Sequence, residues 1–514
     1  MQEKQEKQKN LLFITADQWR GECLSTLGHK VQTPVLDELA KTGVLFKNHF
    51  ANAVPCGPSR ASLHTGMYLQ NHRSSTNGTP LDARHTNWAL EVRKQGFDPV
   101  LFGYTDTAND PRLFDPDDAI LKSYEGPLPG INPITMMGTF PDAWAAWLSE
   151  KGYAIPSPNW RLYMGKNGLE YEAGGDTAAP LDIPKEHHDT WFMVDEVMGY
   201  LDQHPRHEQG FCVHLSLLRP HPPWVAPEPY NSMYPPQTVN DYVRRDTVAL
   251  ESKQHPWLEH TLQQRQSAAP ENQKKLARLK SSYFGLMSEV DANLGRLFDY
   301  LKEKDLWDQT MVIFTSDHGE QIGDHHLLGK MGYFDQSYHI PLIIRDPGQQ
   351  ADATRGKILG KFTENIDIMP TLLEWLGVDL PEQCDGMSLL STTRTGEFPR
   401  NWRTEAHWEF DFRSIDKGED LEQSLGLTHH QCSLNVIRST DYKYVHFTHL
   451  PPLFFDLRND PREFVNQANN PEYQSRVLTY AQKMLSWRMN HDEQTLTHLT
   501  LTDDGVVSRP VARY

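Results

Sequence analysis

Short apolar runs that end in polar residues recur along the chain, and helical segments separate them. A short continuous apolar run is typical of a strand that is buried on both faces of a parallel sheet. The alternation of such runs with helices predicts an α/β domain. The runs lie at residues 11–16, 96–103, 211–216, 311–316 and 340–344.

Helical segments are marked by apolar residues at spacings of three and four and by capping residues. Thr33 and Pro34 begin a helix that Gly43 ends. The longest amphipathic segment runs from Leu276 to Leu297. We predict helices at 34–43, 56–69, 141–151, 187–204, 276–297, 367–377 and 471–490.

The pattern changes beyond residue 390, where short strands follow one another without helices between them. This succession predicts a small antiparallel sheet. The fold class is therefore α/β: a large mixed, mostly parallel sheet sandwiched between helices, with a smaller carboxyl-terminal α+β domain. The late strands are predicted at 433–438, 442–447 and 453–456. The domains are predicted at 1–390 and 391–514, with loop-rich insertions at about 106–185 and 224–270.

Composition narrows the class of protein. The chain has 514 residues and a net charge of −18, which argues against binding to nucleic acids or to anionic membranes. Its five cysteines are widely spaced and give neither a disulfide framework nor a zinc-site spacing. We find no signal peptide and no apolar span long enough to cross a membrane, so we expect a cytoplasmic protein.

Two of the predicted strands end in acidic residues. Asp17 follows the first run, and Asp317 with His318 follows the run at 311–316. Ligands in open α/β sheets bind at the carboxyl ends of the strands. Oxygen ligands with one imidazole favour a divalent cation such as Mn²⁺ over structural zinc. Taken singly, Asp17 is more often a strand-end cap, and Asp317-His318-Gly319 is a common turn sequence.

Cys56 stands in the pattern Cys-x-Pro-x-Arg, which ends at Arg60, at the start of a predicted helix. Gly66 follows six residues after Arg60. An isolated cysteine there would most simply be a buried structural residue. Together with the two metal-type strand ends, however, the stretch resembles the signature of the sulfatase branch of the alkaline phosphatase superfamily. In that family the cysteine is oxidised to formylglycine, whose hydrate is the nucleophile.

The resemblance covers nearly the whole chain apart from the two insertions, and it is most specific to one subgroup. Asp17-Gln18 replaces the Asp-Asp of common sulfatases, and Gly103-Tyr104-Thr105-Asp106 replaces their Gly-Lys-x-His. Asp317-His318 replaces their Asp-Asn. These departures resemble phosphonate monoester hydrolases and phosphodiesterases, as do Arg219-Pro220-His221-Pro222-Pro223 and residues 450–456.

The resemblance implies a metal site for one divalent ion, Mn²⁺ by preference, with Ca²⁺ or Zn²⁺ as alternatives. Its ligands would be Asp17, Asp317, His318 and the modified Cys56. Arg60 would hold the formylglycine and its charge, and would otherwise be a surface ion-pair residue.

The resemblance also assigns residues to the substrate. Asn77 and Tyr104 would hydrogen-bond its non-bridging oxygens, and His221 and Lys330 would neutralise anionic oxygens or protonate the leaving group. Each could instead be an ordinary loop or core residue. The subgroup often has a hydroxyl where this chain has Asp106, so Thr105 or Thr107 could serve instead. His214, His325 and His326 are interpreted as structural.

We therefore expect a hydrolase of small anionic esters that needs a formylglycine-generating enzyme as a partner. The leading hypothesis is hydrolysis of phosphonate monoesters and phosphodiesters, with promiscuous sulfatase activity. An arylsulfatase is the first alternative, and a non-catalytic anion-binding protein is the second. Relatives are often homotetramers, and the tail at 495–514 could serve contacts between subunits.

Overall fold

The structure is a computed structural model of the chain. It describes residues 9–164, 181–204, 210–413 and 421–509. Our predictions for the polar residues 1–8, for part of the insertion at 106–185 and for the last residues of the tail lie outside the described residues.

A nine-stranded sheet forms the centre of the molecule. Its order is β10 (Lys357–Glu364), β2 (Val44–Phe50), β9 (Leu342–Arg345), β7 (Thr310–Thr315), β1 (Asn10–Ala16), β6 (Cys212–Leu217), β4 (Pro99–Gly103) and β5 (Asn132–Met136), with β8 (His339–Ile340) paired to β2. The strands from β7 to β5 run parallel, whereas β9 is antiparallel to both neighbours. The predicted mixed, mostly parallel sheet is confirmed.

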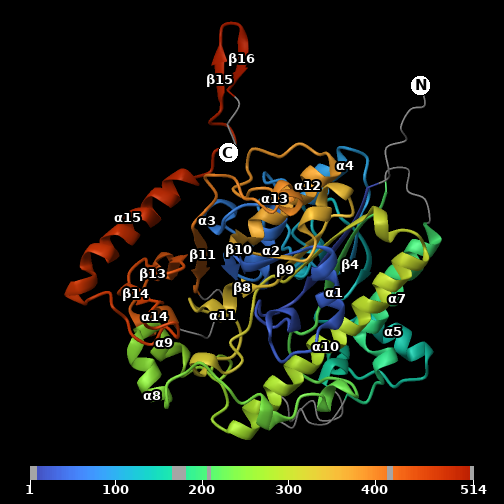
Figure 1. Ribbon diagram of the computed structural model, residues 1–514, viewed down its shortest axis with the longest axis horizontal. Helices are drawn as coiled ribbons and strands as arrows, with labels where there is room; N and C mark the ends of the chain where they lie inside the picture. The colour runs from blue at the N-terminus through green and yellow to red at the C-terminus, as the bar shows by residue number, and fades with distance from the viewer. Residues whose placement is uncertain (1–8, 165–180, 205–209, 414–420, 510–514) are drawn as a thin grey trace.

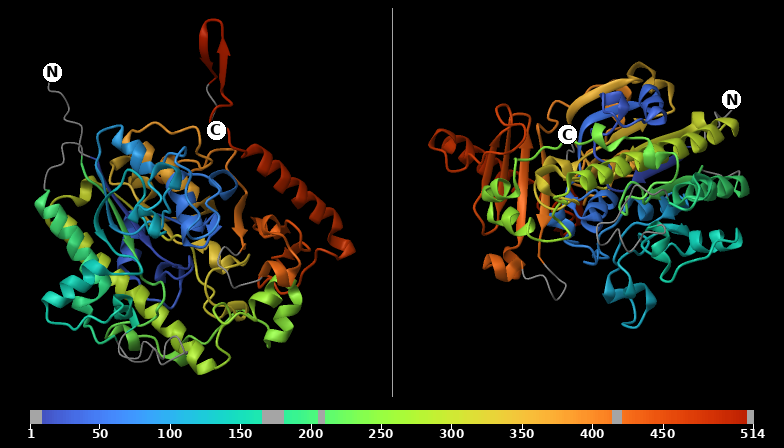
Figure 2. Two further views of the ribbon diagram at one scale, coloured as in Figure 1. Left: turned by 180° about the vertical axis from the view of Figure 1, so that it is seen from behind. Right: turned by 90° about the horizontal axis from the view of Figure 1, so that it is seen from below.

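Helices cover both faces of this sheet (Figures 1 and 2). Strand β1 sends Leu12 and Ile14 into one core and Leu11 and Phe13 into the other. The first core is closed by α1 (Pro34–Thr42), α5 (Asp142–Glu150), α7 (Asp189–Gln203) and α10 (Gln273–Glu303). The second is closed by α2 (Cys56–Thr65), α4 (Trp88–Arg93), α12 (Ile368–Leu376) and α13 (Leu390–Thr395). The sheet is therefore the middle of three layers.

A smaller sheet stands beside the large one. Its order is β14 (Leu453–Asp456), β13 (Tyr442–Phe447), β12 (Ser433–Ser439), β11 (Glu405–Asp411) and β3 (Ala53–Val54). The first four strands are antiparallel, and α15 (Gln474–Asn490) packs against them. The small antiparallel sheet was predicted with three of these strands, and β11 was missed. Strand β3 comes from the segment directly before Cys56 and pairs in parallel with β11.

The prediction for the helix that begins at Cys56 was too long. Helix α2 ends at Thr65 because Gly66 adopts the left-handed conformation, with φ of 68°, and its N–H bonds to the carbonyl of Ser62. A separate short helix, α3 (Leu69–His72), follows.

Both predicted insertions contain more regular structure than the sequence indicates. The first holds the predicted α5 together with β5, and the second holds α8 (Val248–Glu251) and α9 (Pro256–Thr261). Among the helices of the described residues, none is both long and apolar enough to cross a membrane.

The last described residues form a hairpin of β15 (Leu499–Thr502) and β16 (Gly505–Ser508). The hairpin projects away from both sheets (Figure 1), and all of its strand residues are exposed. It belongs to the tail that we predict for contacts between subunits.

Candidate active site

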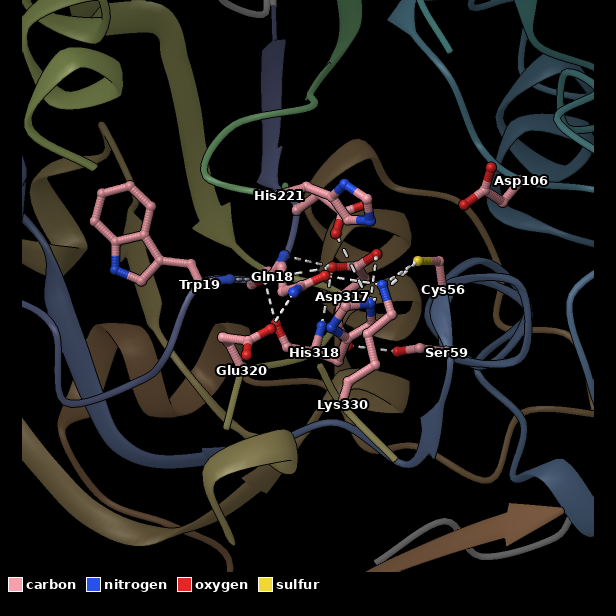
Figure 3. Close-up of polar contacts among 12 residues, drawn as sticks. Gln18, Trp19, Cys56, Ser59, Asp106, His221, Asp317, His318, Glu320 and Lys330 are labelled. Carbon is pink, nitrogen blue, oxygen red and sulfur yellow. Dashed lines mark hydrogen bonds and ion pairs between the residues drawn. The ribbon is translucent and has the colours of Figure 1, made fainter. Parts of the chain in front are cut away.

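The candidate site lies at the carboxyl ends of the parallel strands β7, β1, β6 and β4. Asp17 follows β1, Asp317 and His318 follow β7, and Tyr104 follows β4. Helix α2 brings its amino terminus, with Cys56, to the same edge (Figure 3). The topology therefore gathers residues that are far apart in the sequence, as the strand-end argument predicts.

Four side chains form a compact buried cluster. One ligand atom from each of Asp17, Cys56, Asp317 and His318 lies within 4.8 Å of the others. His318 Nε2 lies 3.2 Å from Cys56 Sγ, 3.7 Å from Asp17 Oδ1 and 3.6 Å from Asp317 Oδ2. Burial lowers the pKa of His318, which favours the neutral imidazole that a metal requires.

The donor set fits a divalent cation. Asp17 Oδ1 is buried and has no hydrogen-bond partner within the described part of the chain. A buried carboxylate oxygen without a partner is costly unless a cation satisfies it. Two carboxylates, one imidazole and the atom at position 56 are the ligands that the sequence predicts; in the unmodified chain, Cys56 Sγ stands where an oxygen of formylglycine would be.

Arg60 holds this cluster together from the second turn of α2. Its guanidinium donates to Asp17 Oδ2 and to Asp317 Oδ2, both at 3.0 Å. It also donates to the Tyr104 carbonyl at 2.9 Å and to Ser216 Oγ at 2.8 Å. Its side chain is 1% exposed, so the alternative of a surface ion pair is wrong.

Lys330 reaches Cys56 from the loop that follows β7. Its Nζ lies 3.1 Å from Cys56 Sγ and 2.8 Å from Gln18 Oε1. Burial alone lowers the pKa of Lys330, but the nearby carboxylates of Asp17 and Asp317 hold this pKa above its usual value. Burial, together with Asp17, raises the pKa of the Cys56 thiol well above its usual range. The unmodified thiol is therefore a poor source of thiolate.

The remaining predicted residues, Asn77, Tyr104 and His221, lie around this cluster. The Asn77 Oδ1 atom accepts the Gly57 N–H at 2.8 Å. The Tyr104 hydroxyl donates to Asp17, and its ring lies 4.3 Å from the Arg60 guanidinium carbon. The His221 ring is held by a contact of 2.7 Å between Nδ1 and the Pro222 carbonyl. Asn77, His221 and Lys330 are half-buried, so they mark the accessible side.

Gln18 and Glu320 complete the site but were not predicted as functional. Gln18 has a φ of 70°, and its side-chain amide donates to Glu320 while its backbone N–H donates to Asp317 Oδ1 at 3.1 Å. Burial raises the pKa of Glu320 to about 7. Their positions, directly after Asp17 and two residues after His318, are the signal that could have identified them.

The histidines interpreted as structural lie outside this cluster. His214 stacks on Phe13 with ring centroids 4.5 Å apart. His325 stacks on Phe334 at 3.6 Å and contacts Glu251 Oε1 at 2.8 Å.

Two protein-family models match the chain. The family model "Sulfatase" matches residues 9–378. A second model, "N-sulphoglucosamine sulphohydrolase, C-terminal", matches residues 323–490. Together the two models reach from β1 to α15.

Individual relatives match over almost their full length. The chain is 42% identical to the multifunctional alkaline phosphatase superfamily protein PehA of Trinickia caryophylli, covering 98% of this chain and 99% of that protein. A phosphonate monoester hydrolase of Agrobacterium radiobacter superposes with a TM-score of 0.91 at 42% identity, covering 98% of this chain and 100% of that one. A phosphonate monoester hydrolase from Silicibacter pomeroyi superposes with a TM-score of 0.91 at 35% identity, covering 98% and 99%.

Proposed function

Because the chain belongs to the sulfatase family of the alkaline phosphatase superfamily, we propose that it is a metal-dependent hydrolase of phosphonate monoesters and phosphodiesters. We propose further that its nucleophile is formylglycine made from Cys56, and that sulfate esters are slower substrates. The observation that carries this proposal is the buried cluster of Asp17, Cys56, Asp317 and His318. The similarity to two phosphonate monoester hydrolases at 35–42% identity supports it.

The ligands Asp17, Asp317, His318 and the modified residue 56 would hold the metal, for which Mn²⁺ is our choice on ligand type. The ion would act as a Lewis acid on an oxygen of the ester. A formylglycine hydrate would supply the attacking oxygen and, through its second hydroxyl, a route of product release by C–O cleavage. Position 56 at the amino terminus of α2 also favours an anion beside it.

The other residues of the site bind and orient. Arg60 fixes the two carboxylates, and Lys330 places a positive charge beside residue 56. The amide nitrogen of Asn77 is the donor that we assign to a substrate oxygen, because Oδ1 is held by Gly57. Burial, with Lys330, lowers the pKa of His221 to about 4. His221 would therefore need the bound anion to become charged and to protonate a leaving group.

Charge decides the expected order of substrates. A diester or a phosphonate monoester carries one negative charge, whereas a phosphate monoester carries two. Few cations here can balance the second charge in a low-dielectric site. We expect kcat/KM to fall from phosphonate monoesters and phosphodiesters, through sulfate monoesters, to phosphate monoesters. The gaps should be orders of magnitude, since each lost charge contact costs on the order of 2–4 kcal/mol.

Matched p-nitrophenyl esters test this order in one assay. A phosphate monoester that reacts faster than the matched diester would refute the proposal. A sulfate ester that reacts faster than the phosphonate would favour the arylsulfatase alternative, which the family model named Sulfatase supports.

The modification has a test of its own. Conversion of Cys56 to formylglycine lowers the mass of its peptide by about 18 Da, which mass spectrometry resolves. The variant Cys56→Ala should lose nearly all turnover and keep its fold, because the side chain is small and lies at a helix end. Fully active enzyme with only unmodified Cys56 would contradict the mechanism, and full activity of the variant would favour a non-catalytic role for this residue.

The exposed hairpin bears on the assembly of the protein, and the cysteines bear on its compartment. An isolated two-stranded hairpin is marginal in water, so β15 and β16 should rest on another copy of the chain, and we propose a homotetramer. Each of the five cysteines is a free thiol, which suits a reducing compartment. We therefore propose a cytoplasmic enzyme that meets a formylglycine-generating enzyme there.

A further inference from the structure

The turn that follows β4 contains Thr105, Asp106 and Thr107, and the sequence does not show which of these three side chains faces the site. The Thr105 hydroxyl donates to the Gly126 carbonyl at 3.0 Å. The Thr107 hydroxyl contacts the Thr105 hydroxyl at 3.3 Å and the Thr105 carbonyl at 3.4 Å. Both hydroxyls are thus engaged in holding the loop, and Asp106 is the member of this turn that turns toward the site.

Figure 3 shows Asp106 on the Cys56 side of the cluster, set apart from the contacts drawn there. The residue is 7% exposed and has a φ of 47°. Its Oδ2 lies 3.7 Å from Arg60 Nε. Its Oδ1 is buried and finds no hydrogen-bond partner in the ranges that the structure describes. Burial raises the pKa of this carboxyl to about 7, so the group carries its negative charge above that pH.

Arg60 is therefore shared by three carboxyl groups. Asp17 and Asp317 each contact it at 3.0 Å, and Asp106 approaches it more loosely. A single guanidinium that faces three carboxyl groups has no surplus positive charge to offer an incoming anion. Lys330 and the metal would have to balance the substrate, and a second substrate charge would lie next to Asp106.

We propose that Asp106 is a specificity-determining residue that makes this site select esters with one negative charge over esters with two. The inference rests on the proposed function, because it concerns the substrates of the same site. Asp106 acts by unfavourable charge: it weakens binding of the dianion more than that of the monoanion. Discrimination of this kind depends on a repulsive element as much as on attractive contacts.

The first experiment compares Asp106→Asn with Asp117→Asn, at a pH above the pKa of Asp106. Both variants remove one carboxylate and keep the shape of the side chain, but Asp117 is exposed to solvent. The measured quantity is kcat/KM for p-nitrophenyl phosphate divided by kcat/KM for p-nitrophenyl phenylphosphonate. Asp106→Asn should raise this ratio by about tenfold or more, and Asp117→Asn should leave it unchanged. An unchanged ratio in Asp106→Asn would overturn the inference.

The second experiment measures binding without turnover. In a Cys56→Ala background, calorimetry compares methyl phenylphosphonate, with one charge, and phenylphosphonate, with two. Adding Asp106→Asn should improve the relative affinity for phenylphosphonate by about tenfold; equal relative affinities with and without Asp106 would refute the role. Asp106→Thr, the hydroxyl that the subgroup often has, repeats the test if the Asn variant is unstable. Wild-type enzyme that hydrolyses neither phosphorus ester would refute the proposed function. The relative affinities for methyl phenylphosphonate and phenylphosphonate would still decide the role of Asp106.

Discussion

Asp317 is the residue on which the metal site depends most. Its Oδ1 accepts the backbone N–H groups of Gln18 at 3.1 Å and His318 at 2.9 Å, and its Oδ2 accepts from Arg60. These contacts fix the carboxylate in one orientation before any ion binds. Such preorganisation is what a ligand needs in order to compete with water for a hard cation.

We expect Asp317→Ala to lose the bound metal and, with it, turnover. The remaining ligands cannot hold a hard divalent ion against water. Elemental analysis of the purified protein measures the metal content directly. Asp308→Ala is the control, because Asp308 lies just before β7 and its side chain is 90% exposed. Stoichiometric metal and wild-type rates in Asp317→Ala would place the metal elsewhere.

Residue positions at strand ends could be predicted from the sequence, and loop positions could not. Asp17 and Asp317 each follow an apolar run, so their meeting at one sheet edge needs only the parallel order of the strands. The contact of Lys330 with Cys56 depends on the path of a loop that has no periodicity. A family resemblance, rather than a physical pattern, identified that lysine.

At the scale of elements, a buried ion-pair network joins α7 to α10. His188, at the amino end of α7, has Nδ1 2.7 Å from Asp189 Oδ1 and 3.2 Å from Glu289 Oε1. Asp189 also accepts from Arg219 at 2.9 Å, and Arg219 donates to the Pro223 carbonyl at 2.8 Å. The network therefore also holds the loop that carries His221.

Stability should fall as pH rises through the pKa of His188. Burial alone lowers this pKa, but Asp189 and Glu289 raise it from 6.5 to about 9. A raised pKa in the folded state adds stability that is fully present below pH 6.5 and is lost as pH approaches 9. We expect a loss on the order of 3 kcal/mol in the free energy of unfolding.

Urea unfolding at the two ends of this pH range measures the effect. His188→Gln should be less stable at low pH and should lose most of the pH slope, whereas the exposed His430→Gln should behave as wild type. An equal slope in His188→Gln and wild type would show that other groups cause the decline.

Elements with an apolar pattern were predicted well, and those shaped by their neighbours were not. The predictions missed β2, whose run of apolar residues is broken by Lys47, Asn48 and His49. They also missed β10, an edge strand whose first residues are mostly exposed. Such strands form because they pair with neighbouring strands of the sheet, and a single sequence does not show which strands will be neighbours.

At the scale of the whole molecule, the terminal hairpin should govern assembly. Leu501 is 82% exposed and Val506 is 64% exposed, which is unusual for apolar residues on a short hairpin. Deleting residues 495–514 should lower the oligomeric mass in light scattering and leave turnover intact, because the described site is built from one chain. Leu501→Asp should weaken assembly without shortening the chain. An unchanged mass in both variants would exclude the hairpin as the contact.

The pairing of β3 with β11 also limits how early the segment before Cys56 can fold during synthesis of the chain. Val54, two residues before Cys56, pairs with Phe410, which the ribosome adds about 350 residues later. At roughly 5–20 residues per second, that delay is on the order of 20–70 s. The final, 5% exposed setting of position 56 includes the contacts with His318 and Lys330 and the pairing of β3, so it is complete only after β11 has been synthesised. If Cys56 is converted to formylglycine as proposed, the modifying enzyme has this interval in which to act on an extended segment, and slower synthesis of the carboxyl-terminal half should increase the fraction of chains that it converts.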